Sequence, residues 1–253
     1  MTEAPTAPTR ERVALGNPSF VWRAGQDRRL ALVQRYVALE HARVLDIGCG
    51  IGTYVRKLRE VSKDAYGIDV DVARLGQATT NGLAAAASEQ LPFGDGAFDV
   101  VLLNEVIEHV RDDAATLREA CRVVRPGGHV AVYAPNRLYP FETHGVYLGR
   151  RYVFGNIPLV NYLPNRLRRR LVPHARAYTS GNIRRLITGL PASPIVCTQV
   201  FPGFDNIAAR SRALGWLLRN VFHRLEATPL RAFGLSHFVI LRVRGSSKGE
   251  RHG

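Results

Sequence analysis

This sequence of 253 residues lacks long apolar runs and a secretion signal and contains few cysteines, and each of these absences excludes a class of protein. No apolar run reaches the roughly 18 residues that a membrane-spanning helix requires. The opening MTEAPTAPTRER lacks the apolar centre of a secretion signal. Only three cysteines occur, far apart and without metal-like spacing, so a disulfide framework is not expected. Together these absences predict a cytoplasmic protein with reduced cysteines.

Acidic residues are also scarce relative to basic ones. The formal net charge is +14, and the stretch from Arg137 to Arg185 contains ten arginines against a single acid, Glu142. Such an excess favours an anionic partner, namely nucleic acid, a phosphorylated substrate or a lipid headgroup surface. The alternative is a solvated basic face without a specific partner.

The order of apolar and helical stretches predicts the fold class. From residue 42 to 134, short apolar runs alternate with helical stretches, which is typical of βα units and a parallel sheet. The pattern predicts an α/β protein with a doubly wound, mostly parallel, Rossmann-like sheet, whose ligand lies at the carboxyl ends of the strands. We expect strands near 42–47, 65–69, 83–87, 98–103 and 128–134, and helices near 53–62, 71–80 and 112–124. RPGG at 125–128 is expected to close the last of these helices and to start the fifth strand.

The alternation fails after Pro135 and returns near residue 180. The intervening residues, about 136–180, are rich in Arg, Tyr, Pro and Asn, and we expect them to form a basic substrate lid between strands five and six. A seven-stranded sheet is then completed by a helix near 180–189, a strand near 194–201, a helix near 206–223 and a strand at 236–243. The helix near 206–223 is amphipathic and basic, and core packing is favoured for it over membrane anchoring.

These elements predict a single domain over residues 21–245. The flanking residues, 1–20 and 246–253, are expected to be disordered tails. Neither an internal repeat nor a long low-complexity segment is visible in the sequence.

One short stretch, VLDIGCGIGTYV at 44–55, carries an acid and three spaced glycines after the first strand. Glycines let a backbone turn sharply and approach a ligand before the next helix. A phosphate-binding P-loop would need Gly-Lys-Ser/Thr, which is missing here. A dinucleotide site stays open, because Asp69 follows at the spacing where an acid contacts a ribose. The loop alone therefore does not separate a nucleotide, a nucleoside-like cofactor and a plain turn.

The segments that follow the loop are more specific. LPFGDGAFDVVLLNEVIEHV and LREACRVVRPGGHVAVYAPN come after the loop in this order, and with them residues 42–135 resemble the class I S-adenosylmethionine-dependent methyltransferases. The resemblance implies methyl transfer, with S-adenosyl-L-methionine as the cofactor. It also implies cofactor contacts from the first motif (Asp46, Gly48, Gly50 and Gly52), from Asp69 to the ribose hydroxyls, from Val70 to the adenine and from Asn104 to the methionine part.

One position departs from this family pattern. Many members carry an acid two residues before the glutamate of E-x-LPF, where it bonds the adenine amino group, but here Ala87 stands in that place. Ser88 and Glu89 are then the candidates for the adenine edge. A Rossmann-like fold that binds no cofactor is the alternative to the whole assignment.

Two clusters of titratable residues follow the fourth and fifth strands. NEVIEHV places Glu105, Glu108 and His109 at helical spacing, and PNRLYPFETHG supplies Glu142 and His144. Many family members carry Glu-His after the fourth strand, so a structural pair that fixes this loop is one interpretation. The other is a divalent metal site for Mg²⁺, Mn²⁺ or Zn²⁺, similar to that of metal-dependent O-methyltransferases with E-x-x-E-H. Its ligands would be Glu105, Glu108, His109 and a lid histidine, His144 or His174.

The candidate catalytic residues are His144, Glu142 and His109. His144 is a possible direct general base, because an unperturbed imidazole titrates near neutral pH. Its neighbours PFETHG resemble the P-x-E-x-H segment of methyltransferases from glycan and lipid-linked saccharide pathways.

The sequence leaves three functions open. The favoured one is O-methylation of a small-molecule, saccharide or lipid-linked hydroxyl, with peripheral contact to an anionic membrane at the inner face. An RNA methyltransferase is the second, in which the arginines and aromatic residues of the lid follow a phosphate backbone and stack bases. The third is a binding protein with the methyltransferase fold and no activity. A methyltransferase for flipped-out amines is disfavoured, because LLNEV lacks an Asn/Asp-Pro-Pro-aromatic stretch.

Overall fold

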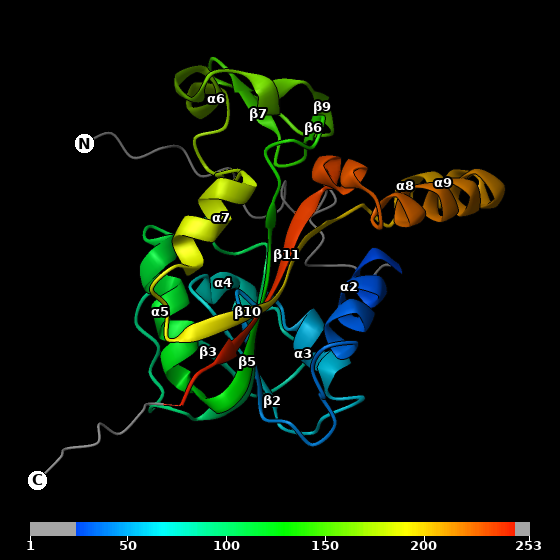
Figure 1. Ribbon diagram of the computed structural model, residues 1–253. Coiled ribbons are helices and arrows are strands. Elements are labelled where there is room, and N and C mark those ends of the chain that lie inside the picture. The colour runs from blue at the N-terminus through cyan, green and yellow to red at the C-terminus, as the bar shows by residue number, and fades with distance from the viewer. Residues whose placement is uncertain (1–23, 246–253) are drawn as a thin grey trace, which may run out of the picture.

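The computed structural model describes residues 24–245 and is organised around a central seven-stranded sheet (Figure 1). The strand order is β10-β11-β5-β4-β1-β2-β3, and only β11 runs antiparallel to its neighbours. This arrangement confirms the α/β, doubly wound and mostly parallel prediction. The strands are β1 (Val44–Ile47), β2 (Ala65–Asp69), β3 (Leu83–Ala85), β4 (Phe98–Asn104), β5 (Val124–Pro135), β10 (Ala192–Val200) and β11 (Ser236–Val243).

Helices cover both faces of the sheet. Alternate residues of each strand point to opposite faces, so Leu45 packs on one side of β1 and Val44 on the other. One face is covered by α5 (Asp113–Val123) and α7 (Ser180–Ile187), and the other by α2 (Ala24–Gln34) and α3 (Thr53–Leu58). Helices bury both faces of the sheet, which explains why the sequences of the parallel strands are nearly continuous apolar runs.

Two elements between β1 and the end of β5 differ from the sequence prediction. The helix expected at 71–80 is a single turn, α4 (Val72–Leu75), because Gly76 and the segment ATTNG after it have poor helix propensity. RPGG at 125–128 does not precede the fifth strand but lies within β5, where Gly127 has a φ of 82°. The tails expected at 1–20 and 246–253 lie outside the described residues.

The segment inserted between β5 and α7 forms a small unit of its own, at the top of Figure 1. Four buried residues form its separate apolar cluster: Val146, Val160, Val172 and Ala175. Its elements are β6 (Phe141–Glu142), β7 (Val146–Leu148), β8 (Arg151–Val153), β9 (Ile157–Pro158), η2 (Val160–Tyr162) and α6 (Asn165–Leu171). We call residues 136–179 the insertion. Its role as a substrate lid stays a prediction.

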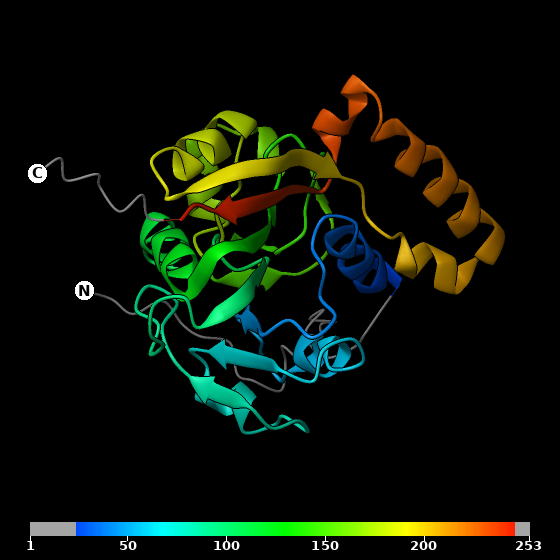
Figure 2. The same cartoon turned by 60° about the horizontal axis from the view of Figure 1, so that its bottom comes forward.

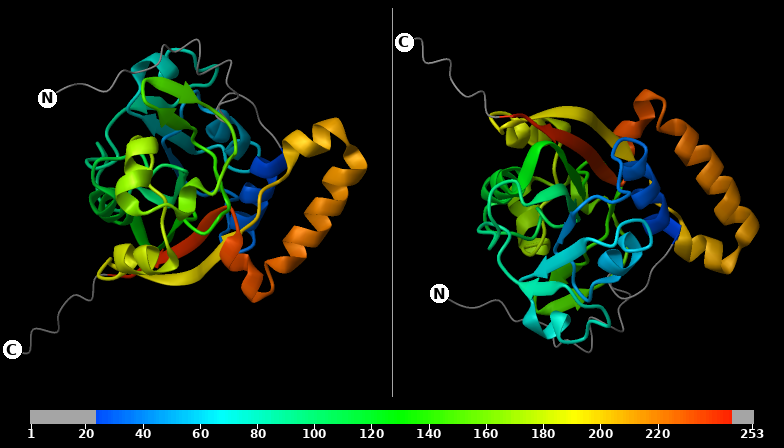
Figure 3. Two further views of the ribbon diagram at one scale, coloured as in Figure 1. Left: turned by 90° about the horizontal axis from the view of Figure 1, so that it is seen from above. Right: turned by 90° about the horizontal axis from the view of Figure 1, so that it is seen from below.

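The amphipathic stretch near 206–223 is not a core helix. It forms two helices, α8 (Asp205–Arg210) and α9 (Arg212–Leu225), because Ser211 is extended and its Oγ accepts a hydrogen bond from Leu214 N at the start of α9. Figures 2 and 3 show this pair standing to one side of the sheet, with α2 beside it. Core packing was therefore the wrong interpretation. Within residues 24–245, no helix is long and apolar enough to cross a membrane.

Candidate active site

The glycine loop between β1 and α3 depends on left-handed backbone conformations. Gly48, Gly50 and Gly52 have φ angles of 74°, 56° and 79°, which L side chains rarely adopt. At Gly52 a Cβ atom would also lie 2.5 Å from Thr80 Cγ2, so no room is left for a side chain. The loop thereby carries backbone groups across the carboxyl ends of β1 and β2.

Asp69 ends β2 and faces this loop. Its Oδ2 accepts a hydrogen bond from Gly50 N and its Oδ1 accepts one from Asp71 N, both at 2.8 Å. Burial and the negative charge of Asp69 raise the pKa of Asp46 to about 8. The next residue, Val70, is 77% exposed. This edge thus combines two close acids with an exposed apolar side chain, which suits a positively charged ligand with a flat ring.

Ser88 and Glu89 bond within the protein. Ser88 Oγ lies 3.1 Å from Thr116 Oγ1, and Glu89 Oε1 accepts a hydrogen bond from Arg111 N at 2.9 Å. Burial alone would raise the pKa of Glu89, but backbone hydrogen bonds lower it overall. Both residues therefore join the loop after β3 to the region around α5. Their contact with an adenine stays a prediction.

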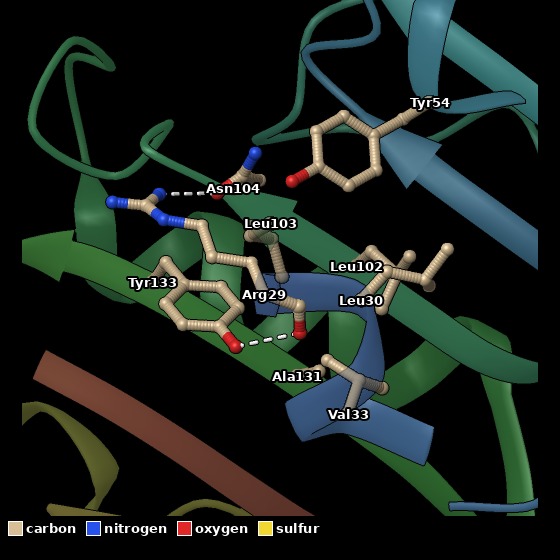
Figure 4. A pocket seen from close by; sticks show the side chains of 9 residues that line it. All are labelled: Arg29, Leu30, Val33, Tyr54, Leu102, Leu103, Asn104, Ala131 and Tyr133. Carbon is tan, nitrogen blue, oxygen red and sulfur yellow. Dashed lines mark hydrogen bonds between the residues drawn. The ribbon is translucent and has the colours of Figure 1, made fainter. Parts of the chain in front are cut away.

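Arg29 of α2 reaches the end of β4, and the sequence interpretation missed it. Its Nη1 donates to Asn104 Oδ1 at 2.6 Å and its Nη2 donates to Glu105 Oε1 at 2.8 Å. Figure 4 shows Arg29 and Tyr54 approaching Asn104 from opposite sides, in a pocket floored by apolar residues of β4 and β5. Burial lowers the pKa of Arg29, but the Glu105 carboxylate more than compensates, so the guanidinium stays charged.

A sequence signal for this helix existed. Leu30, Val33 and Val37 follow one another at helical spacing just before the first strand, and all three are buried. That spacing predicts a helix packed on the sheet. It does not show that Arg29, on another side of the helix, turns toward the site.

Two glutamates of the loop after β4 have different surroundings. Glu105 has a φ of 58°, a strained value for a residue with a side chain, and its Oε1 also accepts a hydrogen bond from Ser236 Oγ at 2.6 Å. Glu108 is 2% exposed, and neither of its carboxylate oxygens has a hydrogen-bond partner in the described part of the chain. Burial raises the pKa of Glu108 to about 8. Burying a carboxylate without hydrogen bonds costs free energy of folding, so the burial of Glu108 indicates a functional role.

Two histidines approach Glu108, one from its own loop and one from the insertion. His109 Nε2 lies 3.9 Å and His144 Nε2 lies 3.8 Å from Glu108 Oε1, and ligand atoms of all three residues lie within 4.8 Å of one another. His109 Nδ1 donates to the backbone oxygen of His174, and His144 Nδ1 donates to Glu142 Oε1, each at 2.9 Å. Because these oxygens only accept, both Nδ1 atoms carry the proton and both Nε2 atoms face Glu108.

The charges of the two imidazoles differ. Burial and the nearby His144 lower the pKa of His109 to about 4, so His109 is neutral. Burial also opposes protonation of His144, but the carboxylates of Glu108 and Glu142 outweigh it and raise the pKa of His144 to about 10. In the chain alone, His144 is therefore protonated and pairs with the Glu142 carboxylate.

Glu142 orients His144. It is 1% exposed, its Oε1 also accepts a hydrogen bond from His144 N at 2.9 Å, and its Oε2 accepts one from Arg168 Nη2 at 2.6 Å. Burial raises the pKa of Glu142, but the contacts with His144 and Arg168 lower it to about 2. A carboxylate held in this way fixes the tautomer and the orientation of a histidine, as carboxylates do in metal sites and catalytic triads. The hydrogen bonds of Glu142 thus hold the His144 ring in one orientation.

The insertion is tied firmly to the loop after β4. Arg176 N donates to the backbone oxygen of Glu108 at 3.1 Å, and its guanidinium donates to the backbone oxygens of Val110 and Arg111, each at 2.8 Å. His174 Nε2 lies 2.9 Å from the backbone oxygen of His144, and His174 is outside the Glu108 cluster. His144, and not His174, is therefore the histidine that the insertion brings to Glu108.

The glycine loop, the acid at the end of β2 and the sheet order are the features expected of the class I methyltransferase fold. Residues 45–132 match the protein family described as "Methyltransferase domain", which confirms the resemblance found in the sequence.

Curated relatives carry a more specific name. The ubiquinone biosynthesis O-methyltransferase of Aromatoleum aromaticum is 33% identical over 139 residues, which cover 51% of this chain and 59% of the relative. The protein of the same name from Rhizobium rhizogenes is 37% identical over 107 residues, which cover 39% of this chain and 43% of the relative. The chain thus spans about half the length of these relatives.

Solved structures agree on the fold. An S-adenosylmethionine-dependent methyltransferase from Mesorhizobium loti superposes with a TM-score of 0.57 at 18% identity, over 84% of this chain and 96% of that protein. A SAM-dependent methyltransferase from Aquifex aeolicus gives a TM-score of 0.56 at 11% identity, over 94% of this chain and all of that protein. At these identities the likeness concerns the fold alone.

Proposed function

We propose that this protein transfers the methyl group of S-adenosyl-L-methionine to a hydroxyl oxygen of a small-molecule, saccharide or lipid-linked acceptor. The observation that carries the proposal is the cluster of Glu108, His109 and His144 at the carboxyl edge of the sheet that bears the glycine loop. The curated relatives support it, because the two quoted above are O-methyltransferases of ubiquinone biosynthesis by name.

The residues at the glycine loop fit the cofactor. Asp46 and Asp69 place two carboxylates side by side, and their mutual repulsion contributes to the raised pKa of Asp46. A sulfonium or ammonium group relieves that repulsion. Asp69 lies where it accepts hydrogen bonds from ribose hydroxyls, and Val70 is exposed for contact with the adenine. Arg29 and Asn104, at the end of β4, are the groups we assign to the carboxylate and amino ends of the methionine part.

The cluster around Glu108 fits a divalent metal ion. The buried Glu108 carboxylate has no hydrogen-bond partner among the described residues, two imidazoles direct Nε2 toward it, and both imidazoles are held through Nδ1 by oxygen acceptors. Glu108, His109 and His144 would be the ligands, a set that suits Mg²⁺, Mn²⁺ or Zn²⁺. Glu105 is not in this cluster and pairs with Arg29. A bound ion would supply Lewis-acid activation by lowering the pKa of an acceptor hydroxyl.

The protein itself supplies alignment and the exclusion of water. Methyl transfer from an activated sulfonium is an in-line displacement, so the main requirement is to hold the acceptor oxygen on the axis of the breaking bond. Arg176 and Glu142 keep the loop after β4 and His144 in place, and the insertion closes this side of the site. If no ion binds, His144 already carries a proton, so the neutral imidazole of His109 is the group that would accept the proton of the acceptor hydroxyl through Nε2.

The outer surface of the insertion suits an anionic acceptor. Besides Arg176, which bonds to the loop after β4, five arginines of the insertion are exposed, whereas Arg168, which the sequence grouped with them, is buried against Glu142. These five are Arg150, Arg151, Arg166, Arg169 and Arg170. A phosphate-bearing saccharide or lipid carrier would be attracted to them.

The first experiment identifies the acceptor. The protein is incubated with S-adenosylmethionine labelled in the methyl group and with the lipid, RNA and small-molecule fractions of a cell extract, with and without EDTA. We expect label in the lipid or small-molecule fraction and loss of turnover with EDTA. Label in RNA would overturn the acceptor assignment. Absence of cofactor binding at millimolar concentration would favour the non-catalytic alternative.

A second experiment tests the metal assignment without using activity. Mn²⁺ binding is followed by electron paramagnetic resonance in the wild type, in Glu108→Gln and in the matched control Glu60→Gln, whose side chain is exposed and lies elsewhere. We expect Glu108→Gln to weaken Mn²⁺ binding by at least about tenfold, with no change in the control. Equal binding by all three proteins would remove the metal from the proposal.

A further inference from the structure

Helix α9 exposes an apolar stripe along its whole length. Leu214, Leu217 and Val221 are spaced three, four and seven residues apart, so they share one face, and they are 46%, 50% and 45% exposed. Trp216 on the adjoining face is 67% exposed. In η3 (Pro229–Phe233), which follows α9 in the chain, Leu230 and Phe233 are also exposed. Apolar side chains grouped in this way on a protein surface usually mark a contact site.

The opposite face of α9 explains why the stripe points outward. Phe222 packs against Phe201 and Phe204, with ring centroids 5.1 and 5.2 Å apart. Gly215 lies so close to α8 that a Cβ atom would be 2.5 Å from Ala208 Cβ. These contacts fix the orientation of α9. The exposed stripe therefore lies on a helix whose other side is packed against the protein.

Charge around the stripe is of one sign. The two acids of residues 203–233 both bond toward the body of the protein: Asp205 with Gly25 N and Arg219, and Glu226 with Arg28 and Phe201 N. Four exposed arginines in the same region form no ion pair with any residue that the structure describes. They are Arg210, Arg212, Arg224 and Arg231. The surface is apolar and cationic, without free acids.

We propose that α8, α9 and η3 form a docking element that binds the surface of an anionic lipid bilayer. An amphipathic helix with leucines on one face, arginines beside them and an exposed tryptophan suits the boundary between headgroups and acyl chains. Its positive charge is attracted to anionic headgroups at close range. Pairing with a second copy of the chain is disfavoured, because it would bring two cationic surfaces together. Nucleic acid is disfavoured because it gives the leucine stripe no apolar partner.

This inference does not depend on methyl transfer. Its test needs neither the cofactor nor the acceptor, so its failure leaves the proposed function standing. Conversely, a chain without activity can still bind lipid through α9.

The experiment measures binding to vesicles. The sequence has two tryptophans, so Trp22→Phe leaves Trp216 as the single emitter. The protein is mixed with phosphatidylcholine vesicles containing about a third phosphatidylglycerol, and with vesicles of phosphatidylcholine alone. We expect flotation with the anionic vesicles only, weakened by salt, together with a shift of Trp216 emission to shorter wavelength. Binding that is absent, or equal for both kinds of vesicle, would overturn the proposal.

Two variants locate the contact. Leu217→Glu combined with Val221→Glu puts charges into the stripe, and we expect vesicle binding to fall by about tenfold or more. The matched control is Ile195→Glu on the edge strand β10, where the side chain is 48% exposed, and it should bind as the wild type does. Thermal melts must show that all proteins remain folded. Unchanged binding by the double variant would overturn the proposal.

A third variant tests the charge. Arg210→Gln, Arg212→Gln and Arg224→Gln together should lower binding to anionic vesicles by about tenfold or more, since each cation near such a surface contributes about 1 kcal/mol. Light scattering is measured in parallel. If the wild type is a dimer that the stripe variant dissociates, the occupant of the stripe is a second copy and the lipid proposal fails.

Discussion

The glycine loop and the insertion both border the carboxyl edge of the sheet, but different interactions hold them in shape. The loop is fixed by its own backbone, through three positive φ angles and a hydrogen bond from Gly50 N to Asp69. The insertion is fixed by buried side chains that meet over long sequence distances, above all Arg168, Glu142 and His144. The shape of the proposed cofactor side is therefore determined by neighbouring residues of the chain, whereas the shape of the proposed acceptor side is determined by tertiary packing.

Breaking the ion pair in the insertion should have the largest effect on stability. Arg168→Met removes the guanidinium that pairs with Oε2 of the buried Glu142 carboxylate, and removing one partner of such a buried pair costs about 3–5 kcal/mol. Thermal and urea unfolding of the variant measure this cost. Adding Glu142→Gln to the variant should recover part of the loss. If Arg168→Met were as stable as the wild type, the insertion would not be held by this pair.

The cofactor side is tested by removing Asp69. Asp69→Ala should weaken binding of S-adenosylmethionine by about 1–3 kcal/mol, since hydrogen bonds to a charged acceptor are lost. Calorimetric titration gives the dissociation constant, and Asp71→Ala, at the half-buried residue that begins α4, is the control. An unchanged constant for Asp69→Ala would contradict the assignment of the ribose contact.

Asp46 should make the stability of the cofactor-free protein depend on pH. Its folded-state pKa is raised to about 8, so the folded chain holds a proton that the unfolded chain releases at lower pH. The stabilising contribution is complete below the unfolded pKa of about 4 and is lost as pH rises toward 8, by at most about 1.4 kcal/mol per pH unit. Urea unfolding between these pH values, compared with Asp46→Asn, isolates this contribution. Identical pH profiles for the two proteins would show that Asp46 is not protonated.

The smallest effect is expected on the exposed helix α9. Leu217→Ala should change the free energy of unfolding by less than about 0.5 kcal/mol, as is usual for surface substitutions. The matched Leu117→Ala removes a side chain of α5 that is 1% exposed, and a buried leucine of this kind contributes about 2–5 kcal/mol. Equal losses in urea unfolding would mean that the stripe on α9 is covered by the protein itself.

Sequence reasoning succeeded where local rules apply. The seven strands, the mostly parallel sheet and the helix near 112–124 follow from the alternation of apolar runs with helical spacing, and the structure confirms them. The helix expected near 53–62 is present but ends at Leu58. It also selected Glu108, His109 and His144, which the structure brings together. The assignments to cofactor, metal and catalysis stay predictions.

It failed where an outcome depends on distant residues. Glu105 stands three residues from Glu108 in the sequence, yet Arg29 and Ser236 engage its carboxylate. In the sequence, Arg168 belongs to a group of four arginines at 166, 168, 169 and 170 that were expected on the surface, but its guanidinium is buried. The sequence pattern predicted an apolar face on the helix near 206–223. It did not predict that this face remains exposed to solvent.

The sequence by itself determined the sheet, the glycine loop and the acid at the end of β2. Backbone conformation and strand faces follow from the identity and spacing of neighbouring residues. Only the tertiary structure decided which imidazoles face Glu108, how Arg29 reaches the end of β4 and which apolar face remains exposed. Such pairings depend on where separate segments meet in space, and hydrophobic periodicity shows that a face is apolar without showing what covers it.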